Sequence, residues 1–253
     1  MKVSLLIADF SGVYAEEGFL QKLQERGVPY RRIGLGDIEG TTCYCDPDAE
    51  AEISRRLVPE PGERMRWIDS GDYHYVTKIL AAREQEPFTL VLVDNHPDDQ
   101  APAFGGVLSC GSWVRDLRET NPMLEEVWTL GPDHRIRNAS GTVDRELETG
   151  IDDLLAALAG KRVYLSIDKD VLDREWARTD WSQGTHSLEK VLSILERLME
   201  GPVQVVAIDV CGALSEEKGA QAEDSRINGE TAQKLYTFIK KHFKTHNTFY
   251  VRK

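Results

Sequence analysis

Apolar runs rich in Val, Ile and Leu alternate along the chain with stretches in which apolar residues recur at helical spacing. Such alternation is typical of a mainly parallel sheet covered by helices on both faces. The pattern predicts strands over residues 2–8, 30–33, 89–93, 126–130, 163–167 and 203–208. It predicts helices over residues 17–24, 73–84, 111–119, 151–158, 188–199 and 229–242. We therefore expect an α/β protein.

Turn-forming residues and the absence of any period predict loops between these elements. The predicted loops cover residues 59–62, 131–141, 173–185 and 211–228. The third of them directly follows the strand predicted over 163–167, so it should overhang the end of that strand. No linker or internal repeat divides the 253 residues. We therefore expect residues 1–253 to form a single domain.

Charge and composition narrow the classes of partner. The formal net charge of -12 and the pI near 5.0 argue against nucleic acid or an anionic membrane as the main partner. No apolar run approaches the roughly 20 residues of a membrane span, and the apolar N-terminal stretch is too short for a signal peptide. The four cysteines are too sparse for a disulfide framework. These features predict a cytoplasmic protein with reduced thiols.

The first group of candidate functional residues follows the strand predicted over 89–93. Asp94, His96 and Asp98 occupy alternate positions directly after this apolar run. Alternate residues of an extended chain point to the same side, and a turn at Pro97 would let the three side chains converge. The sequence therefore predicts a metal site at the end of this strand.

A second pair, Asp168 and Asp170, follows the strand predicted over 163–167 in the same way, and His74 stands early in a predicted helix. The carboxyl ends of parallel strands meet at one edge of a sheet, so these residues should approach the first group. Each has a plainer interpretation when taken singly. An Asp at a strand end is often a helix cap or a loop former, and a His is often only a satisfied polar residue.

Two imidazoles and four carboxylates, without a thiolate, suit hard or borderline divalent cations, of which manganese is the natural expectation. Two such ions roughly 3.5 to 4 Å apart would lower the pKa of a bridging water and make hydroxide available near neutral pH. The sequence thus predicts two Mn²⁺ ions per chain and a hydrolytic reaction. The predicted ligands are His74, Asp94, His96, Asp98, Asp168 and Asp170.

Together these motifs resemble the signature of the arginase/agmatinase (ureohydrolase) superfamily. The resemblance lies in Asp-x-His-x-Asp at residues 94–98, Ser-x-Asp-x-Asp-x-x-Asp at 166–173 and Gly-x-x-His at 71–74. The opening residues 9–14 also resemble the family's first strand and turn, so that the resemblance covers roughly residues 1–215. It implies a three-layer α/β/α sandwich with a mainly parallel sheet of about eight strands. It also implies hydrolysis of the C–N bond of a guanidino or amidino group by a metal-bridging hydroxide.

The resemblance further implies how the ligands are shared. One manganese would take His74, Asp98, Asp94 and Asp170, and the other would take Asp94, His96, Asp168 and Asp170. Asp94 and Asp170 would then bridge the two ions. The candidate catalytic residues are Asp98 and His186, the latter as an acid or base on the overhanging loop.

The substrate-binding residues depart from the family pattern. The family's guanidinium-binding Glu falls on or near Gly212, and residues 109–113 contain no counterpart of its proton-shuttling His. Candidate replacements are a carboxylate in the loop after residue 211, two residues that open a predicted helix, and two residues at the pocket mouth. Each could instead be a solvated loop residue, a helix cap or a packed side chain. In that order they are Glu216 or Glu217, Cys110 and Ser112, and Trp181 and Gln183.

The leading hypothesis is a dinuclear manganese-dependent hydrolase that cleaves a linear C–N bond of a guanidino, amidino or related small substrate. One alternative is a member that retains its metals but is catalytically weak and serves as a binding or scaffold protein. Another is a deacylase of the histone-deacetylase-like type, although those enzymes use one zinc and a His-His pair that this chain lacks. A small molecule is the expected partner, and a homo-oligomer remains possible.

Overall fold

A nine-stranded sheet runs through the molecule in a computed structural model that describes residues 4–103 and 105–246. All pairings from the first strand of this sheet to the seventh are parallel, and the last two strands are antiparallel additions at one edge. The spatial order is β2 (Tyr30–Gly34), β1 (Leu5–Asp9), β4 (Met65–Ile68), β11 (Gln204–Cys211), β10 (Arg162–Asp168), β5 (Phe88–Val93), β7 (Leu124–Leu130), β8 (Arg135–Asn138) and β9 (Asp144–Glu146). A separate two-stranded ribbon joins β3 (Tyr44–Cys45) to β6 (Leu108–Ser109).

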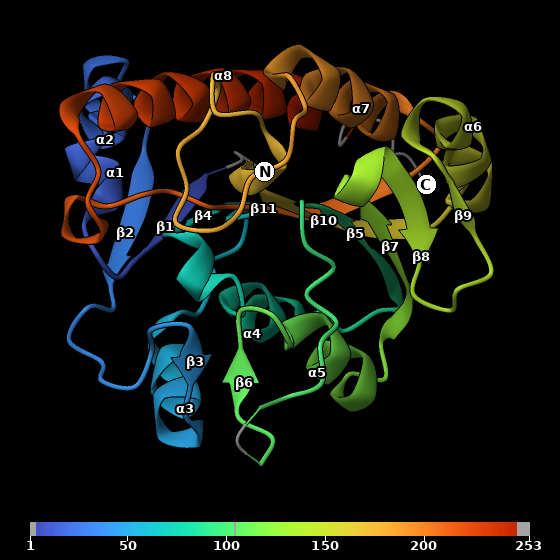
Figure 1. The fold of residues 1–253 in the computed structure, drawn as a ribbon, viewed down its shortest axis with the longest axis horizontal. Coiled ribbons are helices and arrows are strands. Elements are labelled where there is room, and N and C mark those ends of the chain that lie inside the picture. The colour runs from blue at the N-terminus through green and yellow to red at the C-terminus, as the bar shows by residue number, and fades with distance from the viewer. Residues whose placement is uncertain (1–3, 104, 247–253) are drawn as a thin grey trace.

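Helices cover both faces of the sheet (Figure 1). One face carries α1 (Val13–Glu16), α2 (Phe19–Glu25), α6 (Leu147–Ala157), α7 (Leu188–Glu200) and α8 (Ala222–His246). The other carries α3 (Pro47–Arg56), α4 (Val76–Ala81) and α5 (Trp113–Thr120). The predicted α/β sandwich with a mainly parallel sheet is confirmed, with nine described strands in place of about eight.

Alternation along the strands divides the apolar side chains between two cores. Leu5 and Ile7 pack into the core beneath α2 and α8, whereas Leu6 and Ala8 pack into the core beneath α3 and α4. The central strand β5 is buried along its whole length. Burial on both faces explains why β5 reads as a continuous apolar run in the sequence.

Several element boundaries differ from the sequence-based expectation. The strand β4 and the helix α3 were not predicted, and β8 lies inside the predicted loop 131–141. The helix α8 begins at Ala222, inside the predicted loop 211–228, where the Asp224 carboxylate accepts a hydrogen bond from the backbone N–H of Gln221. The predicted strand 2–8 is observed as β1, and residues 1–3 lie outside the described part of the chain.

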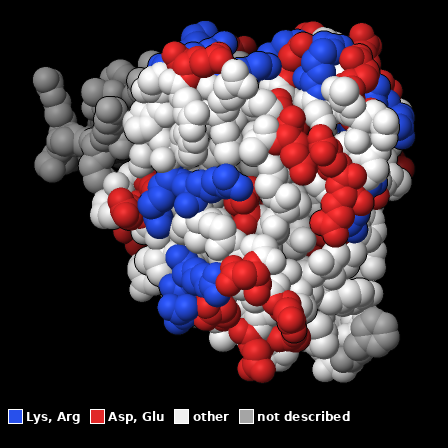
Figure 2. Space-filling model, turned by 90° about the vertical axis from the view of Figure 1, so that its left-hand side faces the viewer, with Lys and Arg blue, Asp and Glu red and all other residues white. Residues whose placement is uncertain are grey.

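The outer edge of the sheet at β2 is protected by charge. Arg31 and Arg32 of this strand pair with Glu63 and Asp9, and charged side chains on an edge strand oppose pairing with other chains. Figure 2 views this side of the molecule and shows basic and acidic side chains next to one another.

None of the helices in the described part of the chain has the length and apolar character that a membrane span needs.

Candidate metal centre

The six predicted ligands come together at the carboxyl ends of three strands. His74 follows β4 through a short 3-10 turn, η1 (Gly71–Tyr73). Asp94 comes directly after β5 and begins the loop that carries His96 and Asp98. The remaining two ligands lie at and just after the end of β10, where Asp168 ends the strand and Asp170 lies in the turn η3 (Lys169–Val171). The topology therefore gathers residues up to about a hundred positions apart in the sequence.

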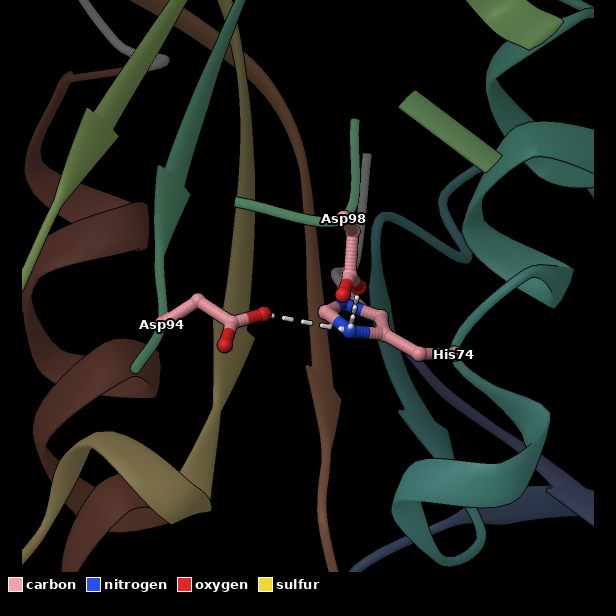
Figure 3. A group of neighbouring side chains, drawn as sticks. All are labelled: His74, Asp94 and Asp98. Atoms are coloured by element: carbon pink, nitrogen blue, oxygen red, sulfur yellow. Dashed lines mark ion pairs between the residues drawn. The ribbon is translucent and has the colours of Figure 1, made fainter. Parts of the chain in front are cut away.

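The imidazole of His74 contacts three carboxylates. Its Nδ1 lies 3.0 Å from Oδ2 of Asp98, 3.3 Å from Oδ2 of Asp94 and 3.4 Å from Oδ2 of Asp168. Figure 3 shows Asp94, at the end of β5, and Asp98, farther along the same loop, with their carboxylates turned toward this imidazole. All four side chains are buried. This first group has the nitrogen and oxygen donors that a divalent cation requires.

A second group is built around His96. Its Nδ1 lies 2.7 Å from Oδ2 of Asp170 and 3.8 Å from Oδ1 of Asp94. Two sets of side chains, His74 with Asp94 and Asp98, and His96 with Asp94 and Asp170, could each hold a metal ion. Asp94 belongs to both sets through different oxygens. The two candidate sites are thus adjacent and share one carboxylate.

Asp168 and Asp170 divide between the two groups differently from what the family resemblance implied. Asp168 lies against His74, and Asp170 lies against His96. The resemblance had placed Asp170 in the His74 group and in the bridging position. The backbone explains the difference, because Oδ1 of Asp168 caps the η3 turn by accepting a hydrogen bond from the N–H of Asp170. This bond ties Asp168 to the floor of the site, and Asp170 lies next to His96.

Neighbouring polar groups hold the ligands in place. Nε2 of His74 lies 2.8 Å from the Ser166 hydroxyl, and Nε2 of His96 lies 2.8 Å from the Ser182 hydroxyl. The indole N–H of Trp113 donates a 2.6 Å hydrogen bond to Oδ2 of Asp98. Such partners fix the orientation of metal ligands and tune their basicity.

Replacing Trp113 with Phe is therefore expected to weaken manganese binding by about tenfold, because Asp98 would lose the hydrogen bond that orients it. A manganese titration followed by calorimetry would measure the change. Trp67→Phe is the matched control, since Trp67 is equally buried but its indole N–H has no partner among the described residues. Equal affinities for the two variants would show that the Trp113 hydrogen bond does not support the site.

Burial and mutual repulsion perturb the acidic ligands. Burial, followed by the charges of neighbouring carboxylates, raises the pKa of Asp94, of Asp168 and of Asp170 to about 7 in each case. The hydrogen bond that His96 donates to the Asp170 carboxylate raises the pKa of His96 to about 9. Burial by itself would lower the pKa of His74, but its bonds with Asp94 and Asp98 raise that pKa well above its ordinary value. The cluster therefore attracts positive charge.

Within the described residues, no Lys or Arg side chain supplies that charge. None of the described residues that line the cavity above the ligands is a Lys or an Arg. Lys169 lies between two ligands in the sequence, but its Nζ sits 3.7 Å from Glu17 and over the ring of Tyr14. Oδ2 of Asp94 is buried without a hydrogen-bond partner in the described structure. The donor set therefore fits divalent cations that prefer oxygen and imidazole ligands.

Of the six candidate substrate-binding residues, two line this cavity and four, including Glu217, do not. The cavity is small, about 50 Å³, and Cys110 and Trp181 contribute to its wall. The Ser112 hydroxyl bonds to Ser109 at the start of α5. The Gln183 amide donates to the backbone oxygens of residues 172 and 177, so it braces the overhanging loop. Glu216 is exposed in η4 (Glu216–Lys218), where its N–H bonds to the carboxylate of Glu16.

The two predicted catalytic residues, Asp98 and His186, lie in different places: one is in the candidate metal centre and the other is outside it. Asp98 belongs to the first metal group, as described above. His186 is buried outside the cavity lining, with its ring 4.4 Å from that of His134 and its Nε2 3.4 Å from the carbonyl oxygen of Gly131. Burial lowers the pKa of His186. The structure therefore does not bring His186 to the metal ligands.

A buried carboxylate that the sequence did not mark, Asp72, lies behind the wall of the site and holds one of its lining residues. Asp72 is buried and accepts hydrogen bonds from the Cys43 thiol at 2.9 Å, from the indole of Trp181 at 3.1 Å and from the ammonium of Lys218 at 2.6 Å. Of these, Trp181 lines the metal cavity. The donors come from three distant segments, so no local pattern marks Asp72 beyond its place in the Gly-x-x-His motif.

Gly212 is packed against Asp168, one of the candidate metal ligands. Its φ is +85°, and a Cβ at this position would lie 2.1 Å from Oδ1 of Asp168. Real Cβ atoms do not approach other atoms so closely, and a side chain at positive φ is strained in any case. The position that should carry the family's guanidinium-binding Glu therefore has no room for a side chain while Asp168 keeps its place.

Comparison with known proteins shows which proteins this chain resembles. No protein-family model matches the chain. An uncharacterized protein from Thermotoga maritima is 30% identical over 214 residues, which are 81% of this chain and 78% of that protein. The two chains belong to one family.

Solved structures identify the fold. The chain matches a hypothetical agmatinase from Burkholderia thailandensis (18% identity, 96% of this chain and 87% of that chain, TM-score 0.64). It also matches the formimidoylglutamase from Bacillus subtilis (16%, 96% and 88%, TM-score 0.65) and the proclavaminate amidino hydrolase from Streptomyces clavuligerus (18%, 95% and 92%, TM-score 0.63). The chain has the ureohydrolase fold. The low identities make it a divergent member of this arginase/agmatinase fold, as its motifs predicted.

Proposed function

We propose that the protein is a dinuclear manganese-dependent hydrolase that cleaves a linear C–N bond of a guanidino, amidino or related small substrate. The observation that carries this proposal is the position of Asp94, whose two oxygens face two adjacent groups of ligands. A shared carboxylate between two imidazole-containing groups suits a pair of ions better than a single one. The absence of a thiolate among the candidate ligands favours manganese over softer metals.

The bound ions would supply hydroxide near neutral pH by lowering the pKa of a water molecule between them. The side chains around the ions would hold the metals and accept a proton. The buried carboxylates Asp94, Asp168 and Asp170 would hold the two cations, whose charge they balance. Trp113 engages Oδ2 of Asp98, which leaves Oδ1 of the same carboxylate to take a proton. His186 takes no part, because it lies outside the cavity lining.

The size of the cavity supports a small planar reacting group. A volume of about 50 Å³ accommodates little more than the end of a substrate. The printed names of the structural neighbours, which include an agmatinase, an amidino hydrolase and a formimidoylglutamase, support the same reaction class. The crowding at Gly212 argues that this chain recognises its substrate with residues other than those of arginase.

The proposal is tested by measuring metal content and reaction products together. Protein loaded with Mn²⁺ is incubated with arginine, agmatine, guanidinobutyrate and formimidoglutamate, and urea, formamide and ammonia are quantified. We expect two manganese ions per chain and release of urea from a guanidino compound or of formamide from formimidoglutamate. Full manganese loading without turnover would favour a metal-retaining binding protein. One zinc per chain with acetate release from acetylated amines would favour a deacylase.

A further inference from the structure

Trp181 forms an outer wall of the metal cavity. It lies in the segment between β10 and α7 and is one of the residues that line the cavity. Trp181 is 41% exposed, which is far more than a cavity of about 50 Å³ can account for, so most of its free surface faces solvent. One side of the indole therefore faces the candidate ligands, and another side faces the outside of the molecule.

The indole is held from two sides of the cavity. On one side its N–H donates a 3.1 Å hydrogen bond to Oδ1 of Asp72, in the turn η1. The ring also lies so close to Gly71, in the same turn, that a Cβ there would be 2.6 Å from Cδ1 of Trp181. On the other side the ring lies edge-on to the imidazole of His96, with centroids 6.3 Å apart. These neighbours follow β4 and β5, which β11 and β10 separate in the sheet, so the indole spans the space between them.

The backbone next to the indole is tied to the loops that carry the ligands. The Ser182 hydroxyl lies 2.8 Å from Nε2 of His96, and the Ser182 carbonyl oxygen accepts a 2.9 Å hydrogen bond from the side chain of Asn95. Farther along, the N–H of Gly184 donates to the carbonyl oxygen of Asp170 at 2.7 Å. These bonds fix the segment across the cavity, so the closed position of the indole is built into the fold.

The closed wall limits what can reach the candidate ligands. Pockets that bind small molecules usually enclose about 300 Å³ or more, whereas this cavity measures about 50 Å³. The indole is the largest side chain in its lining. A planar group of a few atoms fits such a space. A long substituent on that group would have to pass through the place that the indole occupies.

We propose that Trp181 is a specificity-determining residue that restricts the metal centre to compact substrates, in which the reacting carbon carries only a small substituent. The reaction rests on the proposed function, whereas the closure of the cavity by the indole does not. Asp72 is a positioning residue, because it acts on the substrate only through Trp181. The consequence is a preference for short guanidino or amidino compounds over those with a long tail.

Closure of the cavity is tested without metal or turnover, through the thiol of Cys110. This residue lines the cavity and is 8% exposed. The protein is treated with iodoacetamide, and labelling of each cysteine is followed by peptide mass spectrometry. Trp181→Ala should label Cys110 about tenfold faster than the unaltered protein, because thiol reactivity follows access. Cys45 is buried and does not line the cavity. An unchanged rate at Cys110, or an equal acceleration at Cys45, would overturn the closure.

Trp176→Ala is the matched control. Trp176 lies in the same segment, but its ring faces the ammonium of Lys234 and does not line the metal cavity. Labelling of Cys110 in this variant should be as slow as in the unaltered protein. Asp72→Ala should accelerate the labelling, and Asp72→Asn, whose side-chain oxygen still accepts the indole N–H, should restore the slow rate. The same slow rate in Asp72→Ala would refute the positioning role.

The link to substrate choice is tested with manganese-loaded protein and two guanidino compounds, methylguanidine and agmatine, which share urea as a product. The unaltered protein should favour methylguanidine in kcat/KM. Trp181→Ala should raise the ratio of kcat/KM for agmatine to that for methylguanidine by about tenfold, the scale on which pockets discriminate by size. Faster labelling of Cys110 with an unchanged ratio would overturn the specificity role. Faster labelling without hydrolysis of either compound would refute the proposed function and leave the closure in place.

Discussion

Asp168→Asn is expected to remove manganese from the protein and to reduce any hydrolytic turnover by more than about 100-fold. Loss of a residue that merely orients a metal ligand typically costs 10- to 100-fold in affinity or activity, and Asp168 stands in direct contact with the His74 group. Asn preserves the size of the side chain and the oxygen that caps η3. Metal analysis of the purified variant, together with the product assay, measures both effects.

Asp173→Asn is the matched control for this experiment. Asp173 belongs to the same sequence motif, but its carboxylate accepts the backbone N–H of Glu175 and does not line the cavity. Its manganese content should equal that of the unaltered protein. Normal manganese content in Asp168→Asn would refute the assignment of Asp168 as a ligand.

Manganese is expected to stabilise the protein much more at pH 8 than at pH 5.5. Burial and repulsion raise the pKa values of Asp94, Asp168 and Asp170 to about 7 in the metal-free state, above those of an unfolded chain. A raised pKa contributes stability that is fully present below the unfolded pKa and is lost as the pH rises through the folded pKa. The metal-free protein should therefore lose stability between about pH 4 and pH 8, since it must hold three charged carboxylates together.

Thermal melts in chelator and in Mn²⁺ measure this effect. One pKa unit corresponds to about 1.4 kcal/mol, so the melting temperature in chelator should fall by roughly 5 to 10 °C from pH 5.5 to pH 8. Added manganese should restore that loss at pH 8 because it replaces the protons. In chelator at pH 8, Asp168→Asn should melt above the unaltered protein, since one buried charge is gone. A metal-free melting temperature that rises with pH would contradict the clustering of the carboxylates.

The clustering of the candidate ligands at residues 94–98 and 168–170 was predictable because each group is marked locally, by an apolar run that ends in alternating polar residues. The strand β4 lacked such a mark. It has four residues, and the second is Arg66, whose buried guanidinium bonds to the hydroxyl of Tyr164 and lies 3.6 Å from Asp209. Both partners lie about a hundred or more positions away in the sequence. The buried charge of Arg66 is therefore compensated only by contacts that form in the folded protein, and the local sequence does not reveal them.

The helix α3 has a local start signal in the sequence. Asp46 followed by Pro47 is a helix start, with an N-cap side chain and a proline in the first turn. The surroundings of Asp72 had no such signal, because its three partners lie 29, 109 and 146 positions away. Residues that shape the mouth of the site are held by long-range contacts, and a single sequence does not display these.

The contact between Gly212 and Asp168 sets a trade-off for redesign of this protein. Grafting a glutamate into position 212, to imitate arginase, would push the Asp168 carboxylate out of its place beside His74, so that the graft would disturb the proposed ion site that it was meant to serve. New selectivity is better engineered at Glu216 and Glu217, whose exposed side chains do not line the metal cavity.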